Sequence, residues 1–297
     1  MNLFTLPDLK KLHKPKQNSS GEENGQVTII GGSVLFHGAP ILSLKVASRI
    51  VDMVFFASPD PSVGRVAEKI KSKLFSFIWI PWADVDAYIE KSDAVLIGPG
   101  FMRFGSEKRK AKSETRRFEG DGRVSRDITE RLLKKFPEKK WVIDAGSLQT
   151  MDPEWIPKGV ILTPNRKEFE LLFGEELKLR GQKLEISLNE LIPKLQSLSS
   201  KYTCTIVLKC PETIICSPVE CLVVKGGNPG LTKGGTGDVL AGLTVALLAK
   251  NDPFLAAASA AYLAKAAADE LYKKVGTNYN ADDLADKIPE TLNRLTK

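Results

Sequence analysis

Short apolar runs alternate with longer amphipathic stretches over most of the chain. The runs are typical of strands buried on both faces of a sheet. The stretches between them place apolar residues among charged ones at helical spacing. The strands predicted in this way cover residues 27–30, 52–57, 77–80, 93–97, 141–143, 160–162, 205–208, 213–216 and 221–224. The predicted helices cover residues 41–50, 63–74, 85–90, 125–136, 167–173, 188–198, 239–249, 254–275 and 281–295.

Strands that alternate with helices along a chain form a parallel sheet with helices on both faces. We therefore expect an α/β fold with three αβα layers around a mainly parallel central sheet, with a hairpin at 213–216 and 221–224. The chain has no internal repeat, low-complexity tract or obvious linker, so we expect a single domain over residues 1–297. Within it, residues 1–25 are a polar lead-in with weak structure, and residues 101–122 are a basic insertion.

Composition narrows the class of protein. The 297 residues carry a formal net charge of +7, and no apolar run is long enough to cross a bilayer. The N-terminus lacks the apolar core of a secretory signal, so we expect a cytoplasmic protein without a membrane partner. Residues 103–117 hold seven basic residues and two glutamates, which predicts either a solvated loop or a clamp for a polyanionic small molecule. No pattern of a nucleic-acid-binding fold accompanies this charge, and a homo-oligomer remains open.

The four cysteines are Cys204, Cys210, Cys216 and Cys221, and the chain has two histidines. The cysteine spacing does not match the paired CxxC motifs of a zinc site, so we predict no protein-bound metal. The cysteines lie on or near apolar runs, where a thiol behaves as a small buried hydrophobe. We therefore expect free thiols, as is usual in a reducing compartment.

A glycine-rich loop follows the strand at 221–224 and leads into the helix at 239–249. Its core is Gly234, Gly235, Thr236 and Gly237. Glycines let the backbone approach a ligand closely, and a helix start supplies unpaired N–H groups and the positive end of the helix dipole. This combination predicts an anion site, most plausibly for phosphate. The loop is neither a P-loop nor a dinucleotide fingerprint, because Lys233 precedes the glycines and GxGxxG is absent.

Asp238 follows directly after these glycines. A carboxylate repels a phosphate ligand unless it has a chemical task. It can simply be an acidic residue that the helix dipole favours. It can also be a general base that takes the proton from a hydroxyl attacking the transferred phosphoryl group.

Four further predicted strands end in polar or glycine-rich turns, at residues 98–100, 144–147, 163–165 and 209–213. In a parallel sheet the carboxyl ends of the strands share one edge, where ligands of α/β proteins bind. We therefore expect these turns to lie on the same edge as the glycine-rich loop.

Together these segments carry a series of short motifs. They are His13-Lys14, Ile30-Gly31-Gly32-Ser33, Gly38-Ala39-Pro40, Gly98-Pro99-Gly100, Asp144-Ala145, Leu162-Thr163-Pro164, Val207-Leu208-Lys209 with Thr213, Asn228-Pro229-Gly230 and Gly234-Gly235-Thr236-Gly237-Asp238-Val239-Leu240-Ala241-Gly242. The series, over about residues 10 to 275, resembles the ADP/ATP-dependent NAD(P)H-hydrate dehydratase family of the ribokinase-like superfamily.

The resemblance implies an enzyme of metabolite repair, a lyase that restores hydrated NADH or NADPH. ATP or ADP, with Mg²⁺, phosphorylates the hydroxyl that water has added to the nicotinamide ring, and the phosphate then leaves by elimination. An alternative on the same scaffold is a sugar or vitamin-precursor kinase, whose phosphorylated product is stable. A third possibility is a non-catalytic nucleotide- or RNA-binding protein that uses the basic insertion.

The resemblance also implies roles for individual residues. Asp238 matches the catalytic base, and Gly234, Gly235, Thr236 and Gly237 match the anion hole. The nucleotide-binding positions are Lys209, Cys210, Pro211, Glu212, Thr213, Asn228 and Gly237. The substrate-binding positions are Ala39, Gly100, Asn165 and Asp238. No dense carboxylate cluster is present, so Mg²⁺ would be held largely by the nucleotide and water.

The chain departs from the family pattern in three places. Asn165 stands where the family commonly has histidine, and an asparagine can hydrogen-bond a ligand but cannot take a proton. Cys210 replaces a usual glycine and narrows the room beside the nucleotide. The usual short loop after Gly100 is expanded into the basic insertion, which is either an extra clamp on ligand phosphates or a surface feature.

Overall fold

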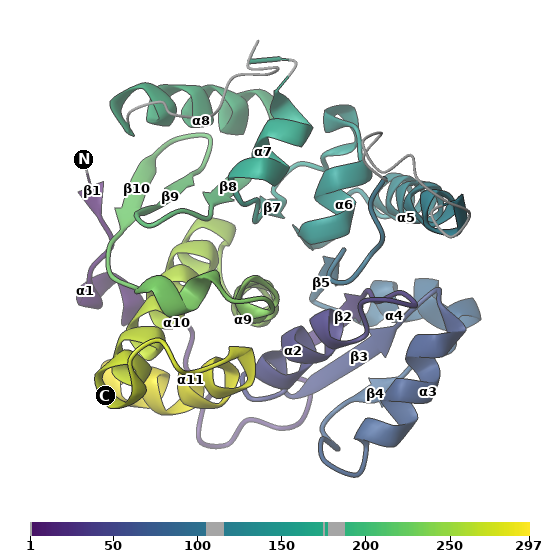
Figure 1. The fold of residues 1–297 in the computed structure, drawn as a ribbon. Coiled ribbons are helices and arrows are strands. Elements are labelled where there is room, and N and C mark those ends of the chain that lie inside the picture. The colour runs from purple at the N-terminus through teal and green to yellow at the C-terminus, as the bar shows by residue number, and fades with distance from the viewer. Residues whose placement is uncertain (1, 105–115, 175, 178–187) are drawn as a thin grey trace.

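The computed structural model describes residues 2–104, 116–174, 176–177 and 188–297. Its centre is one sheet of ten strands in the order β1-β10-β9-β8-β7-β6-β5-β2-β3-β4 (Figure 1). The strands are β1 Asn2–Leu3, β2 Gln26–Ile30, β3 Met53–Ala57, β4 Ile78–Trp79, β5 Ala94–Ile97, β6 Lys140–Ile143, β7 Ile161–Leu162, β8 Thr205–Leu208, β9 Thr213–Cys216 and β10 Cys221–Val224. All neighbouring strands run parallel except that β9 is antiparallel to both β8 and β10. The predicted mainly parallel sheet with a hairpin is thus confirmed.

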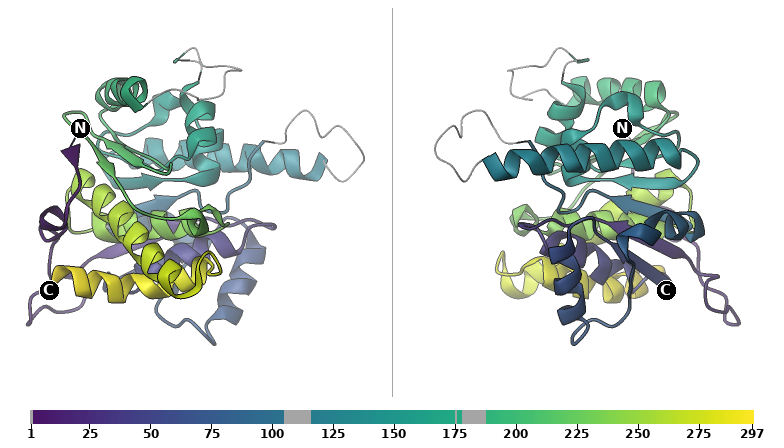
Figure 2. Two further views of the ribbon diagram at one scale, coloured as in Figure 1. Left: turned by 60° about the vertical axis from the view of Figure 1, so that its left-hand side comes forward. Right: turned by 90° about the vertical axis from the view of Figure 1, so that its right-hand side faces the viewer.

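Helices cover both faces of this sheet, as the further views in Figure 2 show. They are α1 Leu6–Leu9, α2 Gly38–Ala47, α3 Pro61–Ile70, α4 Val85–Lys91, α5 Arg116–Lys135, α6 Ala145–Thr150, α7 Arg166–Phe173, α8 Leu188–Tyr202, α9 Thr236–Leu248, α10 Pro253–Val275 and α11 Ala281–Thr296. One layer contains α1 to α3 and α9 to α11, and the other contains α4 to α8. The molecule therefore has the predicted αβα arrangement.

Successive strand residues point into opposite layers, which explains why the strand sequences are apolar throughout. Ile29 packs with the α2 and α9 layer, whereas its neighbour Ile30 packs with the α4 to α8 layer. Leu96 and Ile97 of β5 divide in the same way. A strand that is buried on both faces cannot alternate apolar with polar residues, because each face lies against a helical layer.

Two segments differ from the sequence-based expectation. The lead-in over residues 1–25 is not uniformly weak in structure, because β1 pairs with the exposed edge of β10 and Phe4 packs on Tyr262. A two-residue strand at the edge of a sheet is too short to show a strand pattern in the sequence. The C-terminal part of the basic insertion expected over 101–122 is helical, because α5 begins at Arg116, nine residues before the predicted start of that helix. Residues 105–115 of that insertion lie outside the described residues.

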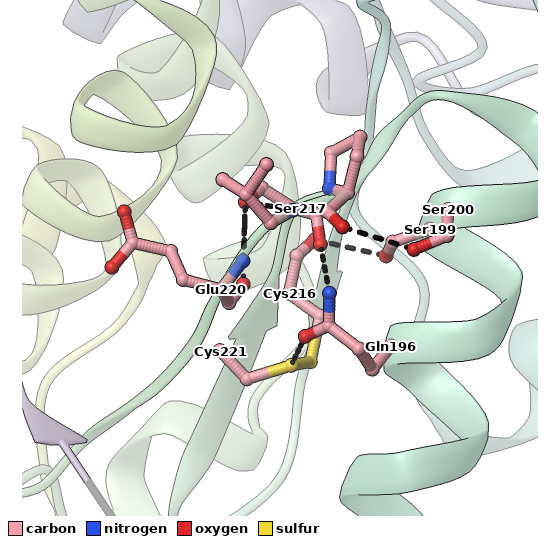
Figure 3. Close-up of a disulfide and its surroundings, with 9 residues drawn as sticks. Gln196, Ser199, Ser200, Cys216, Ser217, Glu220 and Cys221 are labelled. Carbon is pink, nitrogen blue, oxygen red and sulfur yellow. Dashed lines mark hydrogen bonds between the residues drawn. A yellow bond between two sulfur atoms is a disulfide. The ribbon is translucent and has the colours of Figure 1, made fainter.

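The prediction of four free thiols is wrong for Cys216 and Cys221. These residues lie directly opposite each other in β9 and β10 with Cα atoms 4.1 Å apart, and they form a disulfide (Figure 3). Nearby, Ser199 of α8 donates to the carbonyl oxygen of Cys216. Cys204 and Cys210 are free, and Cys204 is buried as expected. The pairing depends on hairpin register, which the spacing of cysteines along the chain does not reveal.

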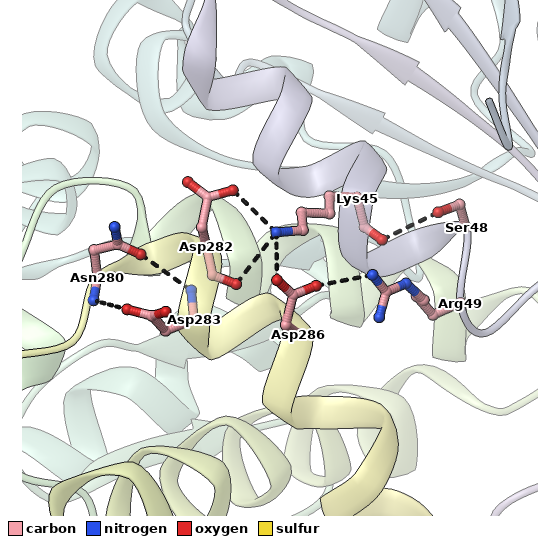
Figure 4. Close-up of polar contacts among 7 residues, drawn as sticks. All are labelled: Lys45, Ser48, Arg49, Asn280, Asp282, Asp283 and Asp286. Atoms are coloured by element: carbon pink, nitrogen blue, oxygen red, sulfur yellow. Dashed lines mark hydrogen bonds and ion pairs between the residues drawn. The ribbon is translucent and has the colours of Figure 1, made fainter. Parts of the chain in front are cut away.

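Polar contacts also join α2 to α11. Lys45 of α2 bonds both Asp282 and Asp286 of α11, at 3.0 and 2.7 Å, and Arg49 bonds Asp286 at 2.8 Å (Figure 4). Shared carboxylates of this kind form a network and not isolated surface pairs. The contacts hold together two helices that both touch the glycine-rich loop, as described below. Among the described helices, none combines the length and apolarity needed to cross a membrane.

Candidate active site

The carboxyl ends of five strands lie on one edge of the sheet. Strands β5, β6, β7 and β8 are consecutive parallel neighbours, and β10 runs in the same direction as β8 because both are antiparallel to β9. The predicted turns at 98–100, 144–147, 163–165 and 209–213 therefore meet the glycine-rich loop on one edge, as expected. Asn165 and Lys209, which follow β7 and β8, are joined by a further parallel bridge.

The glycine-rich loop ends in a turn that requires glycine at one position. Gly235 is the residue before α9 and has a φ of +93°. A Cβ added there would lie 2.5 Å from Leu42 Cδ1 of α2 and 2.8 Å from Ala281 Cβ of α11. In contrast, a Cβ on Gly234 would meet nothing within 4 Å. Gly235 thus lets α9 begin in close contact with the two helices joined by the Lys45 and Arg49 contacts.

Helix α9 lies near the centre of the molecule in Figure 1. Asp238 lies in the first turn of this helix and is half-buried. Its main-chain carbonyl accepts a hydrogen bond from Ser43 Oγ of α2 at 2.7 Å. Gly242 permits this approach of the helices, since a Cβ there would lie 2.4 Å from Ser43 backbone atoms. The start of α9 is thereby held firmly against α2.

The pKa of Asp238 is raised from 3.8 to about 7. Burial is the largest cause, and the negative charges of Asp144 and Glu168 add to it, whereas Lys209 opposes it. A carboxyl group with a pKa near neutrality can accept a proton in one step and release it in another. Perturbation of this kind is common at catalytic positions.

Lys209 links the charged groups of the site. Its ammonium lies 2.7 Å from Asp144 Oδ1 and 3.7 Å from Glu168 Oε2. Asp144 Oδ1 also accepts a hydrogen bond from Thr163 Oγ1 at 2.8 Å. Burial alone would lower the pKa of Lys209, but these carboxylates raise it overall, so the ammonium stays charged. A Cβ added to Gly237 would lie 3.4 Å from Lys209 Nζ, which places this cation beside the start of α9.

A cavity of about 700 Å³ opens next to this cluster. The turn between β8 and β9, the loop after β10, the start of α9 and one face of α10 line it. Of the predicted nucleotide-binding residues, Lys209, Cys210, Pro211, Thr213, Asn228 and Gly237 line the cavity, whereas Glu212 does not. Of the predicted anion-hole residues, Thr236 and Gly237 line it, whereas Gly234 and Gly235 do not. The size is suitable for a small-molecule ligand.

The predicted substrate-binding residues divide into two places. Asn165 lines the cavity, although its side-chain oxygen already accepts from the Glu168 amide and caps α7. Ala39 lies in the first turn of α2, and Gly100 packs against the segment before that helix. Gly100 has a φ of +74°, and a Cβ there would lie 2.4 Å from the Phe36 carbonyl oxygen. Ala39, Gly100 and Asp238 do not line this cavity, although Gly237, the neighbour of Asp238, does.

The sequence analysis gave no individual site role to five residues that shape the site. Asp144 and Glu168 hold Lys209, and they had a signal, since both follow strands that end on this edge. Asp269 and Tyr279 bond the side chain of Asn228, and Lys265 lines the cavity from α10. Lys265 also had a signal, because it is the first charged residue of α10 and follows an apolar, alanine-rich stretch. Among the described residues, no group of three or more His, Cys, Asp or Glu side chains is placed to hold a metal ion.

Comparisons with known proteins agree with this geometry. A sequence model of the NAD(P)H-hydrate dehydratase family matches residues 27–290. A bifunctional NAD(P)H-hydrate repair enzyme of Methanocaldococcus jannaschii is 35% identical over 295 residues, which cover 96% of this chain and 51% of that enzyme. An ADP-dependent (S)-NAD(P)H-hydrate dehydratase of Nitrosopumilus maritimus is 31% identical over 207 residues, which cover 67% of this chain and 64% of that enzyme. The chain thus spans about half the length of the bifunctional relative.

Solved structures show the same fold. The ADP/ATP-dependent NAD(P)H-hydrate dehydratase of Bacillus subtilis, co-crystallised with ATP and Mg²⁺, superposes with a TM-score of 0.71 and 20% identity, covering 99% of this chain and 98% of that one. A ribokinase-like superfamily protein of Enterococcus faecalis gives a TM-score of 0.75 at 22% identity, covering 99% and 96%. From the family match over residues 27–290, the chain belongs to the NAD(P)H-hydrate dehydratase family.

Proposed function

We propose that this chain, as one domain over residues 1–297, is a nucleotide-dependent NAD(P)H-hydrate dehydratase that restores NADH or NADPH from its hydrated form. The observation that carries the proposal is Asp238, a half-buried carboxyl group with a pKa of about 7 in the first turn of a helix that follows a glycine-rich loop. The names of its relatives supply the substrate and the nucleotide.

The first step transfers a phosphoryl group from ADP or ATP to the ring hydroxyl. Asp238 takes the hydroxyl proton as the oxygen attacks phosphorus, and the bond between the transferred phosphoryl group and the nucleotide breaks. The backbone amides around Gly234, Gly235, Thr236 and Gly237 stabilise the charge that develops on the phosphoryl oxygens. Lys209, charged and next to Gly237, adds a cation to the same position.

The second step releases phosphate from the ring. Hydroxide is a poor leaving group, and phosphate is a better one, so the nucleotide makes elimination possible. The electrons of the breaking carbon–oxygen bond leave with the phosphate, while the lone pair of the ring nitrogen forms a carbon–nitrogen double bond. The adjacent ring carbon then gives its proton to the released phosphate, which restores the dihydronicotinamide. Ala39 and Gly100 would line the place of the hydrated ring outside this cavity, and Asn165 would contact the substrate from the cavity lining.

The nucleotide would occupy the cavity beside the turn between β8 and β9, where Lys209, Cys210, Pro211, Thr213 and Asn228 gather. Glu212 would complete this segment from outside the cavity lining. Mg²⁺ would bridge the nucleotide phosphates and reduce their charge. The carboxylates nearest to Lys209 are engaged by it, which is consistent with a metal held by phosphate and water.

A coupled recovery assay tests this proposal. The purified protein is incubated with NADHX or NADPHX, with Mg²⁺ and either ADP or ATP, and the absorbance of the reduced nicotinamide ring is followed. We expect recovery that requires nucleotide, and ADP is tested first because a relative bears an ADP-dependent name. Reactions without nucleotide serve as the control.

The alternative kinase function makes a different prediction. A sugar or vitamin-precursor kinase would accumulate a phosphorylated product and would not restore the reduced ring. Failure to recover NADH or NADPH with either nucleotide, by folded protein, would overturn the dehydratase proposal.

A further inference from the structure

A buried lysine on α10 faces the same cavity. Lys265 is 7% exposed and lines the cavity together with Ala261 and Ala264. Its ammonium donates to the main-chain carbonyl oxygens of Pro211, Val224 and Gly226, at 2.5, 3.0 and 3.1 Å. An ammonium has three donors, so all three are used.

These three carbonyls come from two separate walls of the cavity. Pro211 belongs to the turn between β8 and β9, and Val224 and Gly226 belong to the end of β10 and the loop after it. Pro211 and Gly226 themselves line the cavity. One ammonium therefore fixes the separation of the two segments between which a ligand would lie.

Asp269 lies one helical turn beyond Lys265 on α10. It binds the second wall, which is the loop after β10. Its carboxylate accepts from the Gly227 amide at 2.9 Å and from the Asn228 side-chain amide at 3.0 Å. The cation thus holds the carbonyl of Gly226 while the carboxylate holds the amide of the next residue. Gly226 and Gly227 have φ values of +93° and +83°, a conformation that other residues rarely adopt. Lys265 and Asp269 together hold this irregular backbone in place.

Burial of an ammonium is costly. An apolar residue of the same length would fill the same space among the alanines of α10, but it would leave the carbonyl oxygens of Pro211, Val224 and Gly226 without this donor. Within the described part of the chain, no carboxylate forms an ion pair with Lys265. Among the described residues its hydrogen-bond partners are three main-chain carbonyl oxygens, and two of them, those of Pro211 and Gly226, belong to residues that line the cavity. A charge-assisted hydrogen bond of this kind is stronger than a neutral one.

We propose that Lys265 is a positioning residue that sets the width and shape of the nucleotide-binding cavity by joining its two walls. The inference deepens the proposed function, on which it rests for the identity of the ligand as an adenine nucleotide. Loss of the ammonium should leave the phosphoryl-transfer groups in place but lower the affinity for the nucleotide.

The test is the variant Lys265→Met, which keeps the stem and removes the ammonium. We expect binding of ADP, measured by calorimetry, to weaken about tenfold or more, the change that loss of a charged hydrogen-bond donor typically produces. The KM for the nucleotide should rise by a similar factor, while kcat at saturating nucleotide stays close to wild type. A second variant, Lys265→Gln, retains two N–H donors and should bind ADP with intermediate affinity.

Lys287 offers a matched control, since it is 8% exposed and lies on α11, where it pairs with Glu270 and Glu290. Lys287→Met should lower the melting temperature but leave ADP affinity within about twofold of wild type. Equal ADP affinity of wild type, Lys265→Met and Lys265→Gln would overturn the inference, as would the absence of folded protein for both Lys265 variants.

The two proposals fail in distinguishable ways. A wild type that binds ADP but does not restore NADH or NADPH overturns the dehydratase function, and the effect of Lys265→Met on binding still decides the inference. A wild type that binds neither ADP nor ATP overturns both.

Discussion

The raised pKa of Asp238 predicts that this residue makes the folded protein less stable. We consider the variant Asp238→Asn, which keeps the shape of the side chain and removes its charge. A pKa displaced from 3.8 to about 7 means that the folded state disfavours the ionised carboxylate. Asparagine should therefore slow turnover strongly, because it cannot accept the proton, and should increase the free energy of unfolding above neutral pH. Such opposition between activity and stability is common where a functional group is held in an unfavourable environment.

The magnitude follows from the displacement of the pKa. At 1.36 kcal/mol per pKa unit, the difference corresponds to roughly 4 kcal/mol as an upper limit. Asp238 is half-buried, and water screens the exposed part of its charge, so we expect about 1–3 kcal/mol. We expect kcat to fall by about a hundredfold to ten-thousandfold, the usual contribution of a general base.

The difference in stability between wild type and Asp238→Asn depends on pH. Below pH 3.8 the carboxyl group is protonated in the folded and the unfolded state, so the exchange changes little. Between pH 3.8 and about 7 the folded state binds more protons than the unfolded state, so wild-type stability falls as pH rises. The advantage of Asp238→Asn should grow through this window and be complete above pH 7.

Urea unfolding of wild type and variant at pH 8 and pH 5 measures this difference. At pH 5 the gain should be about two fifths of its value at pH 8. Asp86→Asn is the control with the opposite sign. Burial alone would raise the pKa of Asp86, but hydrogen bonds with Lys135 and Arg131 lower it, so its removal should destabilise the protein at pH 8. An Asp238→Asn variant that is less stable than wild type at pH 8, or one with wild-type turnover, would refute the reasoning.

Three further predictions concern the surroundings of the site. In a pH profile of kcat, Asp144→Asn should move the acidic limb to lower pH, because the charge of Asp144 raises the pKa of Asp238; an unmoved limb would contradict this coupling. Thermal unfolding should show that Gly235→Ala lowers the free energy of unfolding by about 1–3 kcal/mol, because Gly235 has a positive φ and contacts Leu42. Gly234→Ala should change the melting temperature little. Equal effects of the two substitutions would show that the turn does not require glycine. Thiol titration of the unreduced, unfolded protein should detect two of the four cysteines. Reduction of the disulfide between β9 and β10 should make all four thiols titratable and lower the free energy of unfolding by about 2 kcal/mol. Detection of four thiols without reductant would exclude the disulfide.

Periodicity was a good guide to the elements because its cause is local. Strand β8 and both strands of the hairpin have the predicted bounds, and the sheet has the predicted direction. An apolar run indicates a strand that is buried on both faces, and this pattern can be recognised without knowing which strands pair. The start of α5 and the short strand β1 were not predicted, because a helix rich in charge and glycine and a two-residue edge strand have little pattern to detect.

The candidate site was predictable in part. The glycine-rich loop and Asp238 stand together in the sequence, so their spacing predicts a phosphate site beside an acidic residue that is either a general base or a helix-dipole partner. The environment that shifts the pKa of Asp238 was not predictable. Asp144 and Lys209 are 65 residues apart, and only the adjacency of β6, β7 and β8 brings them together.

The amino-acid sequence by itself determined the alternation of strands and helices, the place of the glycine-rich loop at a helix start, and the presence of Asp238 within it. Tertiary structure alone decided which charges surround that carboxyl group, that Lys265 joins two walls of the cavity, and that Cys216 faces Cys221. The physical reason is the distance over which each effect acts. Backbone propensity and apolar periodicity act within a few residues, whereas burial and charge interactions depend on distances through space between segments far apart in the chain.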